Sequence, residues 1–159
     1  MTVKTVSHSQ VIMSNFMLPH QANPSGNVHG GEIMKLIDSA AGVVALRHAR
    51  TNVVTARVDE LKFINPVRIG NVVTCYGKLT FVGRSSMEVS VTVTVEDVSV
   101  DEPAKIALTA YLTFVSLDAH GKPQQVPGLE LTNEEEHRLF EAGKLRYLAY
   151  KEKKEHDLP

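Results

Sequence analysis

The chain has 159 residues, of which 43% are hydrophobic and 22% charged, and this balance fits one soluble globular domain with its own core. The formal net charge of −1 excludes a general attraction to nucleic acid or to an anionic membrane surface. The N-terminal segment lacks the unbroken apolar stretch of a signal peptide, and no segment approaches the roughly 18 apolar residues of a membrane span. We therefore expect a cytoplasmic protein.

The cysteine and histidine content argues against a disulfide and against a metal centre. Cys75 is the single cysteine, and it lies in the strand-like run 72–76, where we expect a small buried core residue rather than a reactive thiol. The seven histidines are scattered without ligand spacing to Cys or Glu, so no metal site and no cofactor are expected. The pair Gly77-Lys78 lacks the upstream glycine and the following Ser or Thr of a phosphate-binding loop.

The first third of the chain predicts a strand, a loop and a helix. Residues 4–17 carry apolar positions typical of a strand, and residues 19–27 are rich in the turn formers Pro, Asn and Gly. The segment 30–48 predicts a helix, because its apolar residues follow the spacing of one buried helical face: Ile33, Leu36, Ile37, Ala40, Ala41 and Val44. This helix is apolar on most sides, which indicates a position in the core.

Most of the remaining chain predicts β-structure. Strand-like segments cover residues 52–64, 72–82, 86–97 and 105–118. The third of them alternates apolar and polar residues most clearly, as expected for a strand with one buried and one solvated face in an antiparallel sheet. A second helix is predicted from Thr132, which has capping-box spacing to Glu135. Its far end carries three cations that suit the helix dipole: Lys151, Lys153 and Lys154.

This order of elements excludes a doubly wound fold and predicts an α+β fold, in which an antiparallel sheet is wrapped around one central helix and a C-terminal helix follows. We divide the chain into one domain at 1–125 and a C-terminal helical extension at 126–159. Such a sheet buries one face on its helix, while its other face and its edges often need a partner chain. We therefore expect an oligomer on structural grounds.

Asp38 is an acidic residue in the middle of the predicted core helix. A carboxylate among apolar residues is costly unless it is paired or hydrogen-bonded, and in a dry cleft it can serve as a base. The alternative is that Asp38 projects from a polar edge of the helix or bonds a nearby backbone group. The residue type alone leaves both interpretations open.

The run His29-Gly30-Gly31 stands at the predicted start of this helix. The first N–H groups of a helix lack internal partners, and glycines there let a ligand come close. Together with the helix dipole this suits the oxyanion of a tetrahedral intermediate, although the glycines could instead serve backbone geometry alone. Gly31 and Asp38 are seven residues apart, so both face one side of the helix. They are about 10 Å apart along its axis, too far for one small ligand group to contact both.

Asn23 lies inside the turn-rich segment 22–27. Its side-chain amide offers both donors and an acceptor, so it can hold a water molecule or a carbonyl group. The competing interpretation is that Asn23 only builds a turn before Pro24.

These segments together resemble the hot-dog fold acyl-CoA thioesterases, which include bacterial cytosolic acyl-CoA hydrolases and the mammalian brain-type enzyme. The resemblance runs from about residue 8 to residue 118. Several separate motifs carry it in the family's order: residues 22–31, 36–38, 53–59, 63–67 and 82–89. It implies a hot-dog fold, hydrolysis of fatty acyl-CoA to free fatty acid and coenzyme A, and a homo-oligomer built as a trimer of dimers.

The resemblance also implies roles for individual residues. Asp38 would act as general base on a water molecule or as nucleophile, Asn23 would position that water or the thioester, and the amides of Gly30 and Gly31 would hold the oxyanion. In this family the Asn and the Asp of one site come from opposite subunits of a dimer. Further residues expected to bind substrate are His29, Gly30, Thr55, Arg84, Ser85 and Ser86. The last three match the segment that contacts coenzyme A, and an Arg with two hydroxyls at a turn suits phosphate oxygens, the alternative being a solvated turn.

Three other functions compete with this interpretation. A hot-dog hydroxyacyl dehydratase would use a His with an acidic residue, and His29 is the candidate, but the Pro-rich loop typical of those enzymes is missing. An acyl-CoA sensor would bind without turnover, which the presence of both Asn23 and Asp38 disfavours. A purely structural oligomer has the least support.

Overall fold

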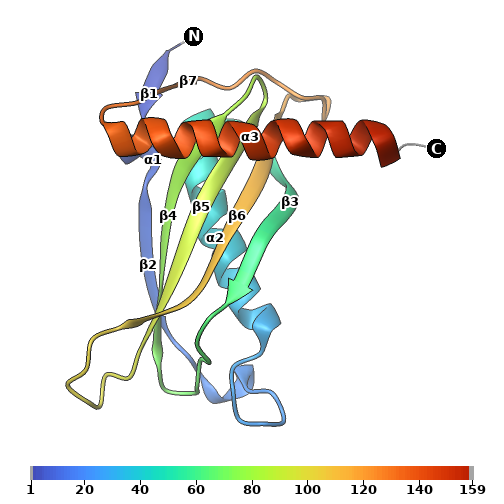
Figure 1. The fold of residues 1–159 in the computed structure, drawn as a ribbon. Helices are drawn as coiled ribbons and strands as arrows, with labels where there is room; N and C mark the ends of the chain where they lie inside the picture. The colour runs from blue at the N-terminus through green and yellow to red at the C-terminus, as the bar shows by residue number, and fades with distance from the viewer. Residues whose placement is uncertain (1, 158–159) are drawn as a thin grey trace.

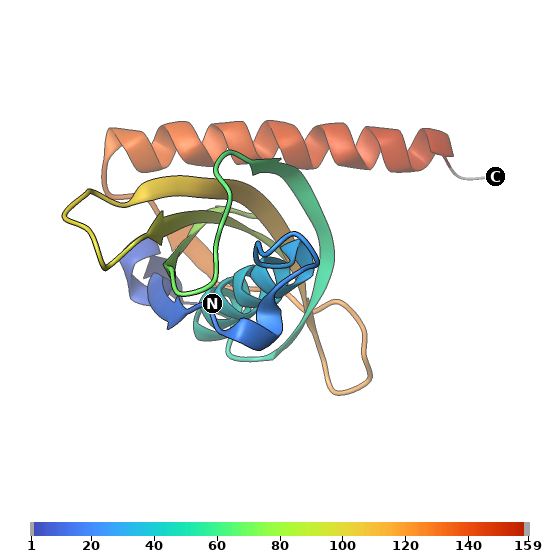
Figure 2. The ribbon, with the colours of Figure 1, turned by 90° about the horizontal axis from the view of Figure 1, so that it is seen from below.

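A curved five-stranded antiparallel sheet forms the body of the protein, in a computed structural model that describes residues 2–157. The strand order is β2-β4-β5-β6-β3. The strands are β2 (Val11–Phe16), β3 (Asn52–Phe63), β4 (Val72–Val82), β5 (Ser86–Glu96) and β6 (Lys105–Leu117). The long helix α2 (Gly30–Ala49) lies in the concave side of this sheet (Figures 1 and 2). The predicted α+β arrangement, with an antiparallel sheet around one central helix, is confirmed.

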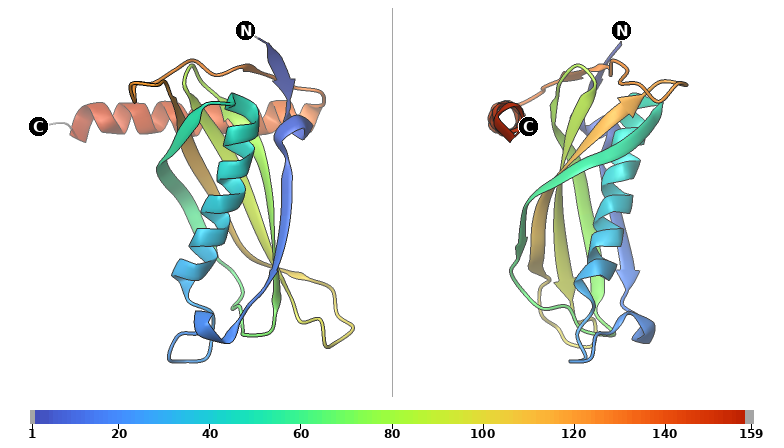
Figure 3. Two further views of the ribbon diagram at one scale, coloured as in Figure 1. Left: turned by 180° about the vertical axis from the view of Figure 1, so that it is seen from behind. Right: turned by 90° about the vertical axis from the view of Figure 1, so that its right-hand side faces the viewer.

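Helix α2 packs on the sheet through small and branched residues. Its buried face carries Ile33, Ile37, Ala40, Ala41, Val44, Ala45, His48 and Ala49. At Gly77 in β4 a Cβ atom would lie only 3.0 Å from Val11 Cγ1 and 3.3 Å from Val44 Cγ2, so the close approach of helix and strand favours glycine there. The helix is not buried on all sides within one chain, because Gly31, Lys35, Asp38 and Leu46 are exposed. The sheet curls around only one side of α2 and leaves the other open (Figure 3).

The predicted first strand at 4–17 is wrong, because three short elements replace it. They are β1 (Val3–Thr5), the single-turn helix α1 (Val6–Ser9) and β2. β1 leaves the main sheet and pairs in parallel with β7 (Gly128–Glu130). Lys4 Nζ donates a 2.7 Å hydrogen bond to the carbonyl of His48, which ties this segment to the end of α2. A 3-10 turn, η1 (Pro19–Gln21), precedes the loop that leads into α2.

Helix α3 (Glu134–Asp157) crosses the outer face of the sheet, on the side opposite to α2 (Figures 1 and 3). The capping residue of α3 is Asn133, one residue later than predicted. Its Oδ1 accepts a 2.8 Å hydrogen bond from the backbone N–H of Glu136. The carboxylate of Glu136 in turn accepts a 2.9 Å hydrogen bond from the backbone N–H of Thr132. The predicted pairing of Thr132 with Glu135 is therefore wrong. The spacing is the same in both pairs, so spacing alone cannot choose between them.

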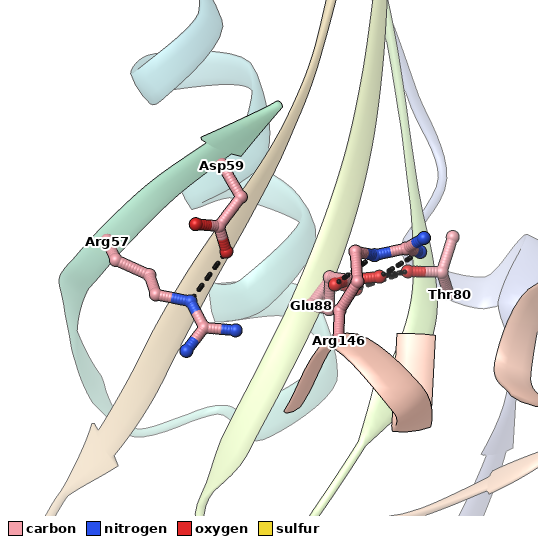
Figure 4. A network of polar contacts seen from close by, with 5 residues as sticks. All are labelled: Arg57, Asp59, Thr80, Glu88 and Arg146. Carbon is pink, nitrogen blue, oxygen red and sulfur yellow. Dashed lines mark hydrogen bonds and ion pairs between the residues drawn. The ribbon is translucent and has the colours of Figure 1, made fainter. Parts of the chain in front are cut away.

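A buried ion pair fastens α3 to the sheet. Glu88 of β5 is 3% exposed and accepts hydrogen bonds from Arg146 Nε at 3.0 Å, Arg146 Nη2 at 2.8 Å and Thr80 Oγ1 at 2.7 Å (Figure 4). Gly143 faces this pair so closely that a Cβ would lie 2.8 Å from Glu88 Oε1.

The division at residues 125 and 126 into a domain and an extension stays a prediction, and its outer bounds at 1 and 159 lie outside the described residues. No helix within residues 2–157 is long and apolar enough to cross a membrane.

Candidate active site

Two free amide groups mark the first turn of α2. His29 is the N-cap residue, and its carbonyl accepts the backbone N–H groups of Glu32 at 3.0 Å and Ile33 at 3.3 Å. In the described part of the chain, the N–H groups of Gly30 and Gly31 have no hydrogen-bond acceptor. Both glycines are exposed, and a Cβ on Gly31 would meet no atom within 4 Å. These two donors are thus open to a ligand, and a helix start favours a ligand with negative charge.

Asp38 lies on the same exposed side of α2 as Gly31, and its carboxylate is held from the sheet. Thr55 Oγ1 of β3 donates a 2.7 Å hydrogen bond to Asp38 Oδ1. Within residues 2–157, Asp38 Oδ2 has no hydrogen-bond partner, which leaves one oxygen of the carboxylate able to accept a proton. Asp38 therefore projects from an exposed face of the helix and is bonded by a hydroxyl, a combination of the two interpretations left open by the sequence.

A β-bulge directs Thr55 toward Asp38. Thr55 pairs with Phe114 of β6, but Arg57 pairs with Thr113, so one extra residue of β3 is inserted between them. Simple alternation would put residues 55 and 57 on the same face of the sheet. The bulge instead turns Thr55 inward to α2, while Arg57 stacks under Tyr150 of α3 on the outer face, its guanidinium carbon 3.5 Å from the ring centre.

Asn23 builds a tight loop with its side-chain oxygen. Asn23 Oδ1 accepts hydrogen bonds from the backbone and hydroxyl of Ser25 at 3.0 and 2.8 Å, and from the backbone of Asn27 at 3.1 Å. The turn-building interpretation is therefore correct for this oxygen. The Nδ2 group has no acceptor among the described residues, so it is the part of Asn23 that could bind a ligand. No hydrogen bond joins Asn23 to Asp38 of the same chain within residues 2–157.

Arg84, Ser85 and Ser86 lie together at the turn between β4 and β5, but far from Gly31. Figure 1 shows this turn at the opposite end of the sheet from the start of α2. A ligand touching both regions of one chain would have to span the helix, about 30 Å for its 20 residues. Arg84 is exposed, whereas Ser86 is 9% exposed and its Oγ lies 3.0 Å from the Cβ position of Gly83. The alternative interpretation as a solvated turn therefore does not hold for Ser86, while the binding of coenzyme A by these three residues stays a prediction.

An apolar hollow beside Gly30 was not foreseen from the sequence. It encloses about 330 Å³ and is lined by Val28, Ile33, Phe63, Ile64 and Leu108, among others. Phe63 reaches within 3.5 Å of the position that a Cβ on Gly30 would occupy. These residues come from a loop, α2, the end of β3 and β6, so no local pattern could identify them as a group. Their apolar character suits hydrocarbon.

His29 has no acidic partner in the described residues, since none of the ion pairs there involves its ring. It is exposed at the N-cap position and makes no side-chain cap. A dehydratase site within one chain would need that acidic partner. Residues 2–157 contain no group of three or more His, Cys, Asp or Glu side chains that could hold a metal ion.

The surface next to Asp38 is apolar and lies at an unpaired sheet edge. β3 ends the strand order of the sheet, so one side of its backbone has no strand partner among residues 2–157. Val54, Val58, Leu61 and Phe63 of this strand are exposed by 43%, 38%, 37% and 60%. A long apolar edge strand of this kind is a template for pairing with another chain.

Comparisons with known proteins identify the family. The model of the thioesterase superfamily matches residues 25–101. The uncharacterized acyl-CoA thioester hydrolase YkhA of Bacillus subtilis is 36% identical over 148 residues, which are 93% of this chain and 86% of that protein. The chain belongs to the acyl-CoA thioester hydrolases of the thioesterase superfamily. The cytosolic acyl coenzyme A thioester hydrolase of Mus musculus is 44% identical over 153 residues, 95% of this chain, but the chain spans only 40% of the length of that relative.

Solved structures of other acyl-CoA thioester hydrolases confirm the predicted hot-dog fold. An apo-hexameric acyl-CoA thioesterase has a TM-score of 0.89 and 33% identity, with all of both chains covered. The acyl-CoA hydrolase of Staphylococcus aureus, solved with butyryl coenzyme A and coenzyme A, has a TM-score of 0.84 and 30% identity over 98% of this chain and 92% of that one. Variants of that enzyme have also been solved in which an Asp, an Asn or a Thr is replaced by Ala.

Proposed function

We propose that this protein hydrolyses the thioester bond of fatty acyl-CoA, giving a free fatty acid and coenzyme A, with Asp38 as the general base. The observation that carries the proposal is the Thr55–Asp38 hydrogen bond of 2.7 Å, on the helix whose first turn carries the free amides of Gly30 and Gly31. The Staphylococcus aureus variants support it through spacing. There the replaced Asn precedes the replaced Asp by 15 residues, and the replaced Thr follows that Asp by 17. Asn23, Asp38 and Thr55 have the same two separations here.

The complete site is proposed to form between two protomers. Asp38 and Thr55 of one chain are exposed beside the apolar edge of β3, and within residues 2–157 no hydrogen bond joins Asn23 of the same chain to either of them. Pairing of β3 with a second copy would cover this edge and the open side of α2. The first turn of the partner's α2 and its Asn23 would then reach the carboxylate. This arrangement gives two equivalent sites in each dimer.

The reaction follows from these groups. Asp38 Oδ2 takes a proton from a water molecule, and the resulting hydroxide forms a bond to the carbonyl carbon of the thioester. The amides of Gly30 and Gly31 donate hydrogen bonds to the oxyanion, and Nδ2 of Asn23 orients the water or the carbonyl. The tetrahedral intermediate then breaks its C–S bond. The coenzyme A thiolate takes up the proton from Asp38, and the fatty acid releases its own carboxyl proton to solvent and leaves as its carboxylate.

Thr55 favours the base over the nucleophile role for Asp38. Its hydroxyl occupies Oδ1 and fixes the carboxylate plane, so that one oxygen remains to accept a proton. Single turnover in ¹⁸O-labelled water distinguishes the two routes. A general base delivers the label only to the fatty acid, whereas a nucleophilic Asp38 would carry label in its own carboxylate.

The proposal extends to the assembly, the substrate path and the location. A trimer of dimers agrees with the hexameric assemblies named for three of the solved relatives. The hollow of about 330 Å³ beside Gly30 is proposed to take part of the acyl chain. The turn at Arg84 is proposed to meet the phosphates of a coenzyme A bound at another protomer's site. A cytosolic location is included because the mammalian relatives are named cytosolic.

Thiol release from acyl-CoAs of increasing chain length tests the activity. We expect the native protein to release coenzyme A, and Asp38→Asn to lose at least about 100-fold of that rate while still binding coenzyme A, since removal of a general base costs about 10² to 10⁴ in rate. Release of thiol at the native rate by Asp38→Asn, or no release from any acyl-CoA by the native protein, would contradict the proposal.

A further inference from the structure

Helix α3 extends beyond the edge of the sheet. Tyr150 of this helix stacks on Arg57 of β3, whose guanidinium carbon lies 3.5 Å from the ring centre. Residues 151–157 continue past that point, and Figures 1 and 2 both show the end of the helix beyond β3. Seven helical residues rise about 10 Å, which equals about two strand spacings. The overhang therefore covers the space where the first strands of a partner sheet would lie.

A groove runs between β3 and the C-terminal half of α3, from Arg146 to Lys154. It encloses about 650 Å³ and carries charges of both signs, with Asp59 and Glu60 from the strand and Arg146, Lys153 and Lys154 from the helix among its lining residues. Arg57 and Arg146 are already held by Asp59 at 2.6 Å and by Glu88 at 2.8 Å (Figure 4). Lys153 and Lys154 have no acidic partner among residues 2–157.

The groove and the helix end each carry acids and lysines, with positive charges in excess on both. The overhang reads Lys-Glu-Lys-Lys-Glu-His over residues 151–156, so it presents acids to the lysines of a groove and lysines to its acids. The end of a helix also carries partial negative charge on its free carbonyl groups. A helix end of this composition fits a groove that contains Lys153, Lys154, Asp59 and Glu60.

We infer that the end of α3 crosses the dimer seam and lies in the groove of the partner protomer, where the partner's α3 runs antiparallel to it. The inference rests on the pairing of β3 that the proposed function requires. A two-fold axis between the paired strands lies about half a strand spacing, or about 2.4 Å, beyond β3, and so passes beneath the helix just after Tyr150. Each groove then receives the other helix end, which closes the arrangement as a self-complementary contact.

Cysteine cross-linking tests this contact in the full-length protein. Lys153 lies near the expected axis, so its two copies are about one helix–helix distance apart, about 8 to 10 Å. Lys144 is an exposed lysine of the same helix, but it lies about 13 Å before Lys153, so its two copies are at least about 25 Å apart. The native Cys75 gives no background, because it is 1% exposed and burial raises the pKa of its thiol to about 11.

We expect Lys153→Cys to form a covalent dimer with a short bismaleimide, at least about 10-fold faster than Lys144→Cys, because only the first pair lies within one helix–helix distance. A monofunctional maleimide confirms that both thiols react. Failure of Lys153→Cys to cross-link, or equal cross-linking of both variants, overturns the inference. The proposed function fails separately, if mixed chains carrying Asn23→Ala and Asp38→Ala do not recover activity. If the mixed chains recover activity but Lys153→Cys does not cross-link, the crossing of α3 into the partner's groove is refuted and the proposed function is not.

Discussion

Replacing Thr55 by valine removes the hydroxyl that holds Asp38 and keeps the shape of the side chain. The lost contact is a 2.7 Å hydrogen bond to a carboxylate oxygen. Bonds to charged groups contribute about 1.5 to 3 kcal/mol, and we take the lower half because Thr55 is exposed within a single chain. At about 1.4 kcal/mol for each factor of ten, kcat should fall about 10- to 40-fold. KM should change little, because Thr55 acts on Asp38 and not on the bound substrate.

The assay is thiol release from an acyl-CoA at saturating and at low substrate, with Thr55→Ser as the matched control. Serine keeps the hydroxyl and should retain most of kcat. Valine suits a strand, so Thr55→Val should unfold at the native urea concentration. The reasoning is refuted if Thr55→Val keeps the native kcat, or if Thr55→Ser loses as much activity as Thr55→Val.

Three more substitutions test the site and the fold. Gly31→Ala adds a Cβ that meets nothing within 4 Å, so the Tm should not fall. The rate of hydrolysis should drop at least about 10-fold, because the methyl group obstructs the oxyanion donors. A native rate of hydrolysis in this variant would contradict the assignment. Glu88→Ala leaves Arg146 without its acceptors and should lower the free energy of unfolding in urea by about 3 kcal/mol. The matched control Glu135→Ala removes an exposed pair and should lower it by less than about 0.5 kcal/mol. Equal losses of unfolding free energy in the two variants would refute the contribution of the buried pair. Burial lowers the pKa of His48, so the unfolded chain binds a proton at this residue more readily than the folded protein does. The Tm should therefore be highest above about pH 6.5 and fall as the pH decreases below that value. His48→Gln should remove the part of this fall that comes from His48.

The main strands and the central helix were predictable because their hydrophobic spacing is strong. β4 begins and ends at the predicted residues, and α2 ends one residue beyond its prediction. The segment 4–17 was mispredicted because its apolar residues fit a strand equally well with or without a break. In the structure Val6 and Ser9 are buried in a single helical turn, and β1 pairs with β7 from the other end of the chain. Sequence spacing contains no information about that distant partner.

The candidate site was only partly predictable. The free amides of Gly30 and Gly31 follow from a glycine pair at a helix start, and the position of Asp38 on the same side follows from the helical repeat. The hydrogen bond from Thr55 depends on the bulge after that residue, which no residue pattern reveals. Asn23 illustrates a second limit, because its oxygen builds a turn while its Nδ2 group stays free for another task.

Co-expression of two inactive chains tests the shared site most directly. One chain carries Asn23→Ala and the other Asp38→Ala, and each alone should be inactive. In a mixed dimer one of the two sites receives both native residues, so random pairing should recover about a quarter of the native activity per chain. Activity that stays at the level of the separate chains, in a mixture shown to contain mixed dimers, would contradict a site built from Asn23 and Asp38 of different protomers.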